Sequence, residues 1–203
     1  MARVTDARER LIESVIELIW TGSYGSTSVD HICERAGVKK GSFYHFFESK
    51  TALAAEGINT AWAVHRAEMD AIFSPIHPAT DRILACMRNL IEEQEKMKAK
   101  HGRVLGCPVH SLGAEISTLD ETLRVQLQAI LAQYLRYFES AIRDAHAQGS
   151  IHAPDAATKA RIVFAYSEGL LTHARIWNDL GQLAELESGV CSILGISPKP
   201  PVS

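Results

Sequence analysis

Residues 27–53 read Thr-Ser-Val-Asp-His-Ile-Cys-Glu-Arg-Ala-Gly-Val-Lys-Lys-Gly-Ser-Phe-Tyr-His-Phe-Phe-Glu-Ser-Lys-Thr-Ala-Leu, and this stretch decides the fold. It predicts two short helices around a tight turn and then the start of a third helix. Thr27, with Asp30 three residues later, fits a capping box at the start of the first helix. Gly37 ends that helix, because glycine adopts the left-handed conformation that a sharp turn needs. Ser49 is placed to cap the third helix, which we expect to begin at Lys50.

The second short helix is expected from about Lys40 to Phe47, and its two sides differ. Phe43 and Phe47 are four residues apart and therefore face the interior together. The opposite side is polar and consists of Lys39, Lys40, Ser42, Tyr44 and His45. The lysines can neutralise phosphates, and the other side chains can donate to phosphate oxygens or reach base edges. Gly41 has no side chain, so the backbone can approach a duplex closely. The sequence therefore predicts a DNA-binding face, with a solvated helical hairpin as the simpler alternative.

Residues 9–53 resemble the DNA-binding domain of the tetracycline-repressor (TetR) family. The resemblance implies an all-α, homodimeric transcription regulator, usually a repressor, that a small ligand releases from its operator. It implies recognition-helix contacts with DNA by Lys40, Gly41, Ser42, Tyr44 and His45. It implies phosphate contacts by Thr27, Ser28 and Lys50. We expect a near-palindromic operator, with each Lys39–Phe47 helix in a major groove about one helical turn or slightly more from its mate.

Lys39 departs from the family pattern, which commonly has a serine that caps the recognition helix. A lysine cannot cap, and its charge is unfavourable at the positive end of a helix. A nearby DNA phosphate would relieve this repulsion. We therefore expect Lys39 to lower stability and to raise affinity for DNA.

The composition sets limits on this interpretation. The chain has 203 residues, 46% of them hydrophobic, and a formal net charge of −3. That length fits one large or two small domains, and we expect a helix-turn-helix domain over 1–49 and a ligand-binding and dimerisation domain over 50–203. A negative net charge is unusual for a DNA-binding protein. Residues 35–50 contain four Lys or Arg and one Glu, so a small local patch, doubled by dimerisation, would supply the affinity.

The sequence gives no sign of export or of a metal site. No apolar run is long enough to span a membrane, and the N-terminus lacks the apolar segment of a signal peptide, so we expect a cytoplasmic protein. The four cysteines, Cys33, Cys86, Cys107 and Cys191, lack metal-binding spacing and are expected to be reduced. We expect no cofactor, and we interpret all but Cys107 as core residues.

The rest of the chain has helical patterning and no strand pattern, so the expected class is all-α. We expect helices over 5–21, 50–71, 81–100, 108–117, 120–148, 155–180 and 182–194, and a frayed tail over 197–203. The long helices near the C-terminus carry large apolar residues around a glycine: Ile162, Tyr166, Gly169, Leu170, His173, Ile176 and Trp177. We interpret this set as a dimer face that forms a four-helix bundle across a two-fold axis, with internal core as the alternative.

A second informative stretch, residues 106–115, reads Gly-Cys-Pro-Val-His-Ser-Leu-Gly-Ala-Glu. Pro108 suits the first position of a helix, which places Cys107 at the N-cap, where free amides stabilise a thiolate. Arg103 and His110 add positive charge nearby. The pattern Gly-Cys-x-x-x-x-Leu-x-x-Glu is similar to a TetR subgroup that includes the N-ethylmaleimide- and acrylate-responsive repressors, in which the matching cysteine is implicated in sensing. We expect Cys107 to react with electrophiles or oxidants; the alternative is an inert residue buried at a helix start.

A non-covalent pocket for a small organic ligand is also expected, with mostly apolar walls and a few polar groups. Its candidate residues are Trp62, His65, Met69, Met87, Leu90, His110, Tyr166, His173 and Trp177. Two other functions compete with that of a regulator. One is an enzyme with Cys107 as nucleophile and His110 as base, for which no third orienting group is recognisable. The other is a helical adaptor that binds no DNA. An activator remains open beside a repressor.

Overall fold

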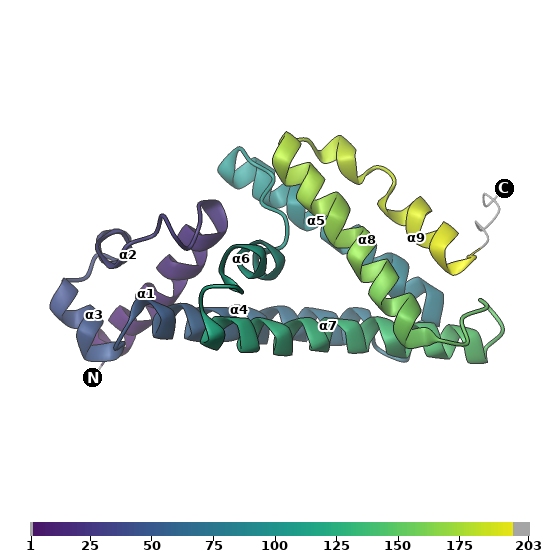
Figure 1. The fold of residues 1–203 in the computed structure, drawn as a ribbon, viewed down its shortest axis with the longest axis horizontal. Coiled ribbons are helices and arrows are strands. Elements are labelled where there is room, and N and C mark those ends of the chain that lie inside the picture. The colour runs from purple at the N-terminus through teal and green to yellow at the C-terminus, as the bar shows by residue number, and fades with distance from the viewer. Residues whose placement is uncertain (1, 197–203) are drawn as a thin grey trace. The chain divides into compact units, whose positions relative to one another are not determined.

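The computed structural model describes residues 2–196, with side chains from residue 6 onward. Within that range every regular element is a helix, as Figure 1 shows: α1 (Ala2–Thr21), α2 (Val29–Ala36), α3 (Lys40–Phe46), α4 (Lys50–Ile72), α5 (Ala79–His101), α6 (Pro108–Ile116), α7 (Glu121–Ala147), α8 (Ala156–Trp177), the 3-10 turn η1 (Leu180–Leu183) and α9 (Leu186–Leu194). The predicted all-α class is confirmed. The segment 197–203, predicted to fray, lies outside the described residues.

Residue contacts divide the chain into two compact units. The first unit consists of residues 1–66 and 108–130, and the second of residues 67–107 and 131–203. Helix α6 therefore packs with the three N-terminal helices, although it follows them by many residues in the chain. The expected domain boundary at residues 49 and 50 stays a prediction. No helix in the described part of the chain is both long enough and apolar enough to cross a membrane.

The first unit is built on the inner faces of its short helices. Leu11 of α1, Ile32 of α2 and Phe43 of α3 are all fully buried. None of these helices could bury an apolar side alone, so their stability comes from packing against one another. Gly57 of α4 allows a close approach, because a Cβ at this position would lie 3.0 Å from Val15 Cγ1.

The start of α2 corrects one sequence prediction. Ser28, and not Thr27, is the N-cap: its hydroxyl accepts a hydrogen bond from the His31 amide at 3.1 Å, and the His31 ring accepts from the Ser28 amide. Thr27 is buried and donates its hydroxyl to the Ser23 carbonyl oxygen at 2.7 Å. Both side chains are able to cap a helix, and the local sequence does not reveal which one precedes the first helical turn. The turn to α3 follows the prediction, since Gly37 has a φ of 63°.

The second unit packs α5, α8 and α9 with the second half of α7 around one apolar core. In Figure 1, α8 and α9 lie side by side, with η1 between them in the chain. A buried arginine fixes the turn before α5. Arg82 is 5% exposed, its Nη1 lies 2.7 Å from Asp144 Oδ2 of α7, and its Nε donates to the His77 carbonyl oxygen. The charge is thus paired where an unpaired one would be costly.

The helix limits follow the predictions to within a few residues, except near the C-terminus. Helix α8 ends at Trp177 and not near residue 180, because Asn178 adopts a left-handed conformation with a φ of 50°. The Asp179 carboxylate then accepts from the Gly181 amide and starts the 3-10 turn. The single helix expected over 182–194 is therefore η1 followed by α9. At the start of α4, Ser49 accepts from the Ala52 amide at 3.0 Å, as predicted.

Candidate nucleic-acid interface and thiol site

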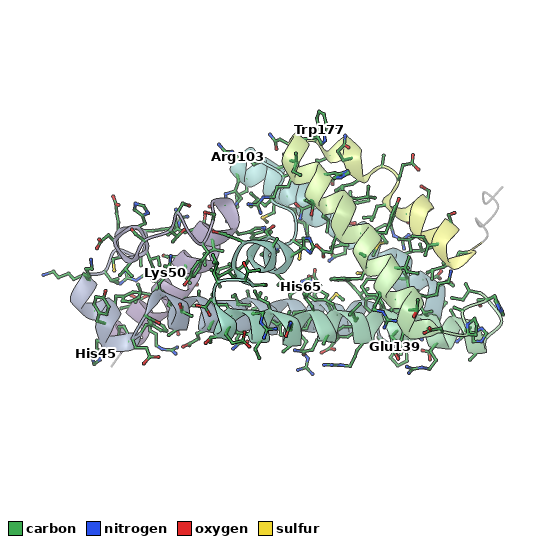
Figure 2. All side chains as sticks on the ribbon, viewed as in Figure 1. His45, Lys50, His65, Arg103, Glu139 and Trp177 are labelled. Atoms are coloured by element: carbon green, nitrogen blue, oxygen red, sulfur yellow. The ribbon has the colours of Figure 1, made fainter. Side chains whose placement is uncertain are left out.

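Helix α3 is held to the first unit by its inner side. Phe43 is fully buried and Phe47 is 4% exposed, and the centroids of their rings are 6.1 Å apart. The outer side presents Lys40, Gly41, Tyr44 and His45 to solvent, while Ser42 is half-buried. Tyr44 is 56% exposed and meets the Phe43 ring edge-on. Figure 2 shows His45 on α3. The two-sided pattern predicted for this helix is therefore present.

Lys39 is the N-cap residue of α3, and its side chain makes no capping hydrogen bond. Its backbone is extended, with φ −77° and ψ 149°, which is the conformation that a capping serine would have. The first amides of α3 are thus left without a side-chain cap, next to an exposed lysine. Both features favour an anion at this helix end.

Lys40 is paired within the free protein. Its Nζ lies 2.8 Å from Asp30 Oδ1 of α2, and both side chains are exposed. The hydrogen bond and the charge of Asp30 raise the pKa of Lys40. A pair this exposed contributes little to stability. Lys40 is therefore available to exchange Asp30 for a phosphate or a base edge.

Gly41 faces open space, because a Cβ built on it would meet no atom within 4 Å. Gly57 is the opposite case, because a Cβ built on it would lie 3.0 Å from a side-chain atom of Val15 and 3.1 Å from one of Ile16. Glycine inside a helix costs roughly 0.5–1 kcal/mol relative to alanine. Packing within the first unit explains the glycine at 57 and gives no reason for the glycine at 41.

Lys50 has a structural role that the sequence did not reveal. Its Nζ donates to the carbonyl oxygens of Tyr24 and Thr27, at 2.8 and 2.9 Å, and lies 3.9 Å from the centroid of the Tyr24 ring. Burial lowers the pKa of Lys50, and the charge of Glu115 opposes that shift. Lys50 therefore ties the loop before α2 to the start of α4. Phosphate contacts by Lys50, Thr27 and Ser28 stay predictions; Ser28 is exposed, and Thr27 is buried with its hydroxyl already donated.

Glu115, in the last turn of α6, also binds the loop before α2. Its two carboxylate oxygens accept from the amides of Tyr24 and Gly25, at 2.9 and 2.7 Å. Two charge-assisted hydrogen bonds to backbone amides form a strong and directional contact. Asp120, just after α6, adds another link, since its Oδ2 accepts from the Thr51 hydroxyl at 3.1 Å. The residues after the thiol are thereby bound to the helix-turn-helix segment.

In the second unit, the backbone before Cys107 is fixed on both sides. The Gln94 side-chain oxygen accepts from the amides of Leu105 and Gly106, at 3.1 and 2.7 Å. Arg175 of α8 donates to the Leu105 carbonyl oxygen at 2.8 Å. Gly106 has a φ of 65°, and a Cβ there would lie 3.4 Å from the Leu171 carbonyl oxygen. Cys107 follows directly and precedes Pro108, the first residue of α6, as predicted.

Cys107 is hydrogen-bonded to Glu168 of α8, which the sequence analysis did not select. The Glu168 side chain is 6% exposed. Burial raises the pKa of Glu168 to about 7, although the hydrogen bond from Cys107 acts in the opposite direction. A sequence signal existed: Glu168 falls among Val163, Leu171 and Ala174, which share the buried side of α8. A carboxylate in that position needs a partner or a function.

Two further groups face the thiol and the carboxyl. Burial raises the pKa of Tyr134, and the charges of Cys107 and Glu168 add to that rise. Complete burial raises the pKa of Cys86 to about 12, so this thiol remains protonated and unreactive at neutral pH. Cys33 is also buried, while Cys191 is half-buried.

The other candidate ligand residues belong to both units. Trp62 and His65 belong to the first unit, with ring centroids 6.0 Å apart, and His110 is exposed on α6. In the second unit, Met69 and Met87 are buried in the core, and Leu90 packs against it. The Tyr166 hydroxyl donates to the Glu185 carbonyl oxygen at 2.8 Å. A single ligand pocket formed by all these residues therefore stays a prediction.

Helix α8 exposes an apolar stripe. Ile162 is 46% exposed, and Ile176 and Trp177 are each 71% exposed. Gly169 and His173 are exposed between them, and Figure 2 shows the Trp177 side chain projecting from the molecule. Such residues are seldom left in water without a partner. Tyr166 and Leu170, assigned to the same face, are half-buried.

An open groove of about 750 Å³ lies between α1 and α2 in the first unit. It is lined mainly by charged side chains and includes an ion pair between Arg35 and Glu17, 2.5 Å apart. None of the predicted DNA-binding or ligand-binding residues lines this groove.

Comparison with known proteins matches both parts of the chain. Residues 11–56 match the model of the bacterial regulatory proteins, tetR family, and residues 79–189 match the tetracyclin repressor-like, C-terminal domain. The transcriptional regulator AcuR of Cereibacter sphaeroides is 32% identical over 162 residues, which cover 76% of this chain and 70% of AcuR. The HTH-type transcriptional repressor NemR of Escherichia coli K12 is 29% identical over 120 residues, 59% of this chain and 58% of NemR. The crystal structure of a regulatory protein TetR from Rhodobacter sphaeroides superimposes with a TM-score of 0.81 and 26% identity, over 93% of this chain and 98% of that chain.

Proposed function

We propose that the chain, which belongs to the tetR family of bacterial regulatory proteins, is a homodimeric repressor. Its α3 helices would bind a near-palindromic operator. The family membership makes the chain a transcriptional regulator. The finer proposal is that an electrophile or a small organic molecule acts at Cys107 and releases the operator. Such a compound releases DNA only if it favours the DNA-incompetent state of the protein.

Gly41 gives the strongest support for a DNA contact through α3. The residue weakens its own helix and faces open space, so its benefit lies outside the chain. The backbone of a DNA duplex can approach closely at such an open position. Lys39, Tyr44 and His45 surround it with exposed donors. Two copies of this small face, and not a large basic surface, would supply the affinity, which agrees with a net charge of −3.

The exposed stripe on α8 supports the homodimer. Ile162, Ile176 and Trp177 lie on one helix, and Gly169 between them lacks a side chain that would keep a second helix away. A two-fold axis would place the same stripe of a second copy against it, as isologous interfaces require. The dimer would then present two α3 helices to two half-sites.

The surroundings of Cys107 support a thiol-based sensor. Its backbone is held by Gln94 and Arg175, and its thiol is hydrogen-bonded to a buried carboxyl group. The relatives include NemR, named as a repressor, and AcuR, named as a transcriptional regulator. The enzyme interpretation needs His110 as the base, whereas the thiol is hydrogen-bonded to Glu168.

The operator contact is tested by gel retardation with DNA from upstream of the protein's own gene. We expect Tyr44→Ala to lose at least about tenfold in affinity, since one good base or phosphate contact is worth about 1–3 kcal/mol. Val64→Ala is the matched control, because Val64 is 73% exposed on α4 and is assigned no contact. Retardation by Tyr44→Ala at wild-type concentrations would contradict the proposed face.

The sensor is tested in the same assay with N-ethylmaleimide. We expect this electrophile to release the wild-type protein from DNA and to leave Cys107→Ser bound. Cys191→Ser is the control for a half-buried thiol elsewhere in the chain. If Cys107→Ser is released as readily as the wild type, the sensor lies at another residue.

A further inference from the structure

The Glu168 carboxyl group and the Cys107 thiol form a hydrogen-bonded pair inside the second unit. Glu168 comes from the middle of α8, and Cys107 from the end of the segment that joins α5 to α6. Only 6% of the glutamate is exposed, while Cys107 is half-buried and remains partly accessible. A reagent that reaches the thiol therefore meets it with a carboxyl group already in contact.

A buried carboxyl group in this position does not serve packing. Its neighbours on the inner side of α8 include Val163, Leu171 and Ala174, which are fully or almost fully buried apolar residues. An apolar side chain of similar size would suit that surface without the cost of taking a carboxylate out of water. Groups placed at such a cost are concentrated at sites of chemistry.

We propose that Glu168 is the general base for Cys107 when the thiol adds to an uncharged α,β-unsaturated carbonyl compound. This inference rests on the proposed function, in which Cys107 is the sensor. Glu168 is positioned by α8, and its carboxylate accepts the hydrogen of the thiol. No other residue is required for the proton transfer.

The reaction balances without an oxidant or a co-reactant. The carboxylate takes the thiol proton while the sulfur forms a bond to the β-carbon of the unsaturated compound. The π-electron pair of the carbon–carbon double bond moves toward the carbonyl group and gives an enolate. The protonated Glu168 then gives this proton to the α-carbon. The net change is the addition of S–H across the double bond, which leaves a thioether on Cys107 and a carboxylate on Glu168.

The pair is matched for this transfer. A free glutamic acid and a free thiol differ by about four pKa units, which makes proton transfer between them unfavourable. Burial raises the pKa of Glu168 to about 7 and so narrows that difference. The first amides of α6 are next to Cys107 and favour the negative charge that develops on sulfur.

The charged and titratable groups around the pair come from other helices. Tyr134 of α7 and Cys86 of α5 face the pair, and Glu68 of α4 in turn acts on Tyr134 and Cys86. Tyr134 and Cys86 are neutral at physiological pH because burial raises the pKa of each. Glu68 is half-buried and adds negative charge. An anionic electrophile is therefore repelled from the thiol when Glu168 is ionised, whereas a neutral one is not.

The first test follows Cys107 alkylation by acrylamide, using mass spectrometry of the full-length protein from about pH 5 to about pH 10. In the wild type, we expect the rate to rise with an inflection near the pKa of Glu168. In Glu168→Gln, we expect a rate at neutral pH lower by about tenfold or more, and a rise that follows ionisation of the thiol itself and no longer the pKa of Glu168. Glu92→Gln, at an exposed position of α5, is the matched control and should behave as the wild type.

Equal or faster alkylation of Glu168→Gln at neutral pH would overturn the proposal, since the carboxyl group would then have no effect on the alkylation rate or would slow it. Glu168→Asp should retain the shape of the wild-type profile at a reduced rate, because a carboxylate is present but shorter. If the Gln variant does not fold, the wild-type profile still decides: an inflection well above the pKa of Glu168 reports an unassisted thiol and contradicts a general base.

The second test concerns the charge of the electrophile. Acrylamide and acrylate differ in intrinsic reactivity, so the ratio of their rates is compared between proteins. At a pH above neutrality, we expect the preference for acrylamide to fall in Glu168→Gln relative to the wild type and to be unchanged in Glu92→Gln. An equal preference in the wild type and in Glu168→Gln would remove the charge selectivity from the proposal.

Failure of this inference can be told apart from failure of the proposed function. If alkylation of Cys107 does not release DNA, the sensor proposal fails whatever the alkylation rates are. If alkylation releases DNA and Glu168→Gln is alkylated and released at the wild-type rate, the sensor stands and the role of Glu168 is excluded.

Discussion

At the N-terminus of α3, Lys39 occupies a cap position that its side chain cannot fill. The extended backbone there is the one that a serine uses to accept a hydrogen bond from the second or third amide of a helix. The lysine also places a positive charge at the positive end of the helix. At the residue scale, we propose that Lys39 contacts an anion outside the chain.

Lys39→Ser is predicted to stabilise the protein and to weaken DNA binding. The new cap should raise the free energy of unfolding by about 1 kcal/mol, measured by urea titration. Loss of one phosphate contact per subunit should lower the salt dependence of operator binding by about two counterions per dimer. Lys100→Ser, at an exposed position of α5, should change neither quantity. An unchanged salt dependence in Lys39→Ser would place this lysine away from the DNA.

Glu168 should make stability depend on pH. Its pKa is raised to about 7 in the folded protein, whereas a glutamate in the unfolded chain titrates near about 4.3. Between these values the folded state binds a proton that the unfolded state has lost. The free energy of unfolding therefore falls as the pH rises through this range, by about 4 kcal/mol, and is level above it.

Glu168→Gln should abolish that fall and be more stable than the wild type at about pH 8. Urea titrations at several pH values measure this difference, with Glu92→Gln as the control. A wild-type free energy of unfolding that is constant between about pH 4.5 and about pH 7 would contradict the account of this residue.

At the scale of elements, the Gly-Cys-x-x-x-x-Leu-x-x-Glu pattern covers α6 and the two residues that precede it. Gly106 has a positive φ where the chain passes Leu171 and Arg175 of α8, and Cys107 meets Glu168. Leu112 is 3% exposed, and Glu115 holds the loop between α1 and α2 through two amides. One short helix thus begins at the thiol and ends at the helix-turn-helix segment. A displacement of α6 would therefore displace that loop as well.

Glu115→Gln is predicted to loosen the loop, because an amide side chain has one acceptor oxygen where the carboxylate has two. We expect faster hydrogen exchange at the Tyr24 and Gly25 amides and a loss of about 1–3 kcal/mol in the free energy of unfolding. Glu121→Gln is a matched control, since Glu121 is exposed and pairs only locally with Arg124. Unchanged exchange at both amides would show that Glu115 does not hold the loop.

The elements that local residues specify were predicted well. The turn at Gly37, the cap at Ser49 and the buried pair of Phe43 and Phe47 depend on neighbours within one helical turn. The choice of Ser28 over Thr27 as a cap was missed, because both are chemically suitable and the packing of Thr27 decides. The end of α8 was missed because Asn178, a residue compatible with a helix, adopts a left-handed conformation.

The contacts across long stretches of chain were not predicted. Glu115 meets a loop 90 residues earlier, and Lys50 meets carbonyl oxygens that carry no side-chain signal. Glu168 and Cys107 are brought together only by the packing of the second unit. A single sequence has no pattern that indicates which residues far apart in the chain lie in contact.

At the scale of the whole molecule, the proposed dimer through the exposed stripe on α8 would make one small DNA-binding face per chain sufficient. Two faces on a dimer bind with an effective concentration that a single face lacks. Ile176 and Trp177 are 71% exposed, so their burial in a dimer would remove apolar surface from water. In the proposed regulator, dimerisation and DNA binding would therefore be linked by mass action.

Ile176→Asp is predicted to convert the dimer into monomers, because an interface between copies cannot bury two unpaired carboxylates. Sedimentation velocity measures the change, and operator affinity should fall with it. Leu119→Asp is the control, since Leu119 is 78% exposed in the first unit and lies outside the stripe. A dimer that persists in Ile176→Asp would assign the interface to another surface.

Selection from fragmented genomic DNA tests the central claim, that the outer side of α3 is a DNA-binding surface. The full-length protein, with reduced thiols and no inducer, is mixed with the fragments at low ionic strength, and the bound DNA is sequenced. We predict strong enrichment of a small number of fragments that share a near-palindromic site, and loss of that enrichment in Tyr44→Ala. Recovery of all fragments in proportion to their abundance, by wild type and variant alike, would contradict the account.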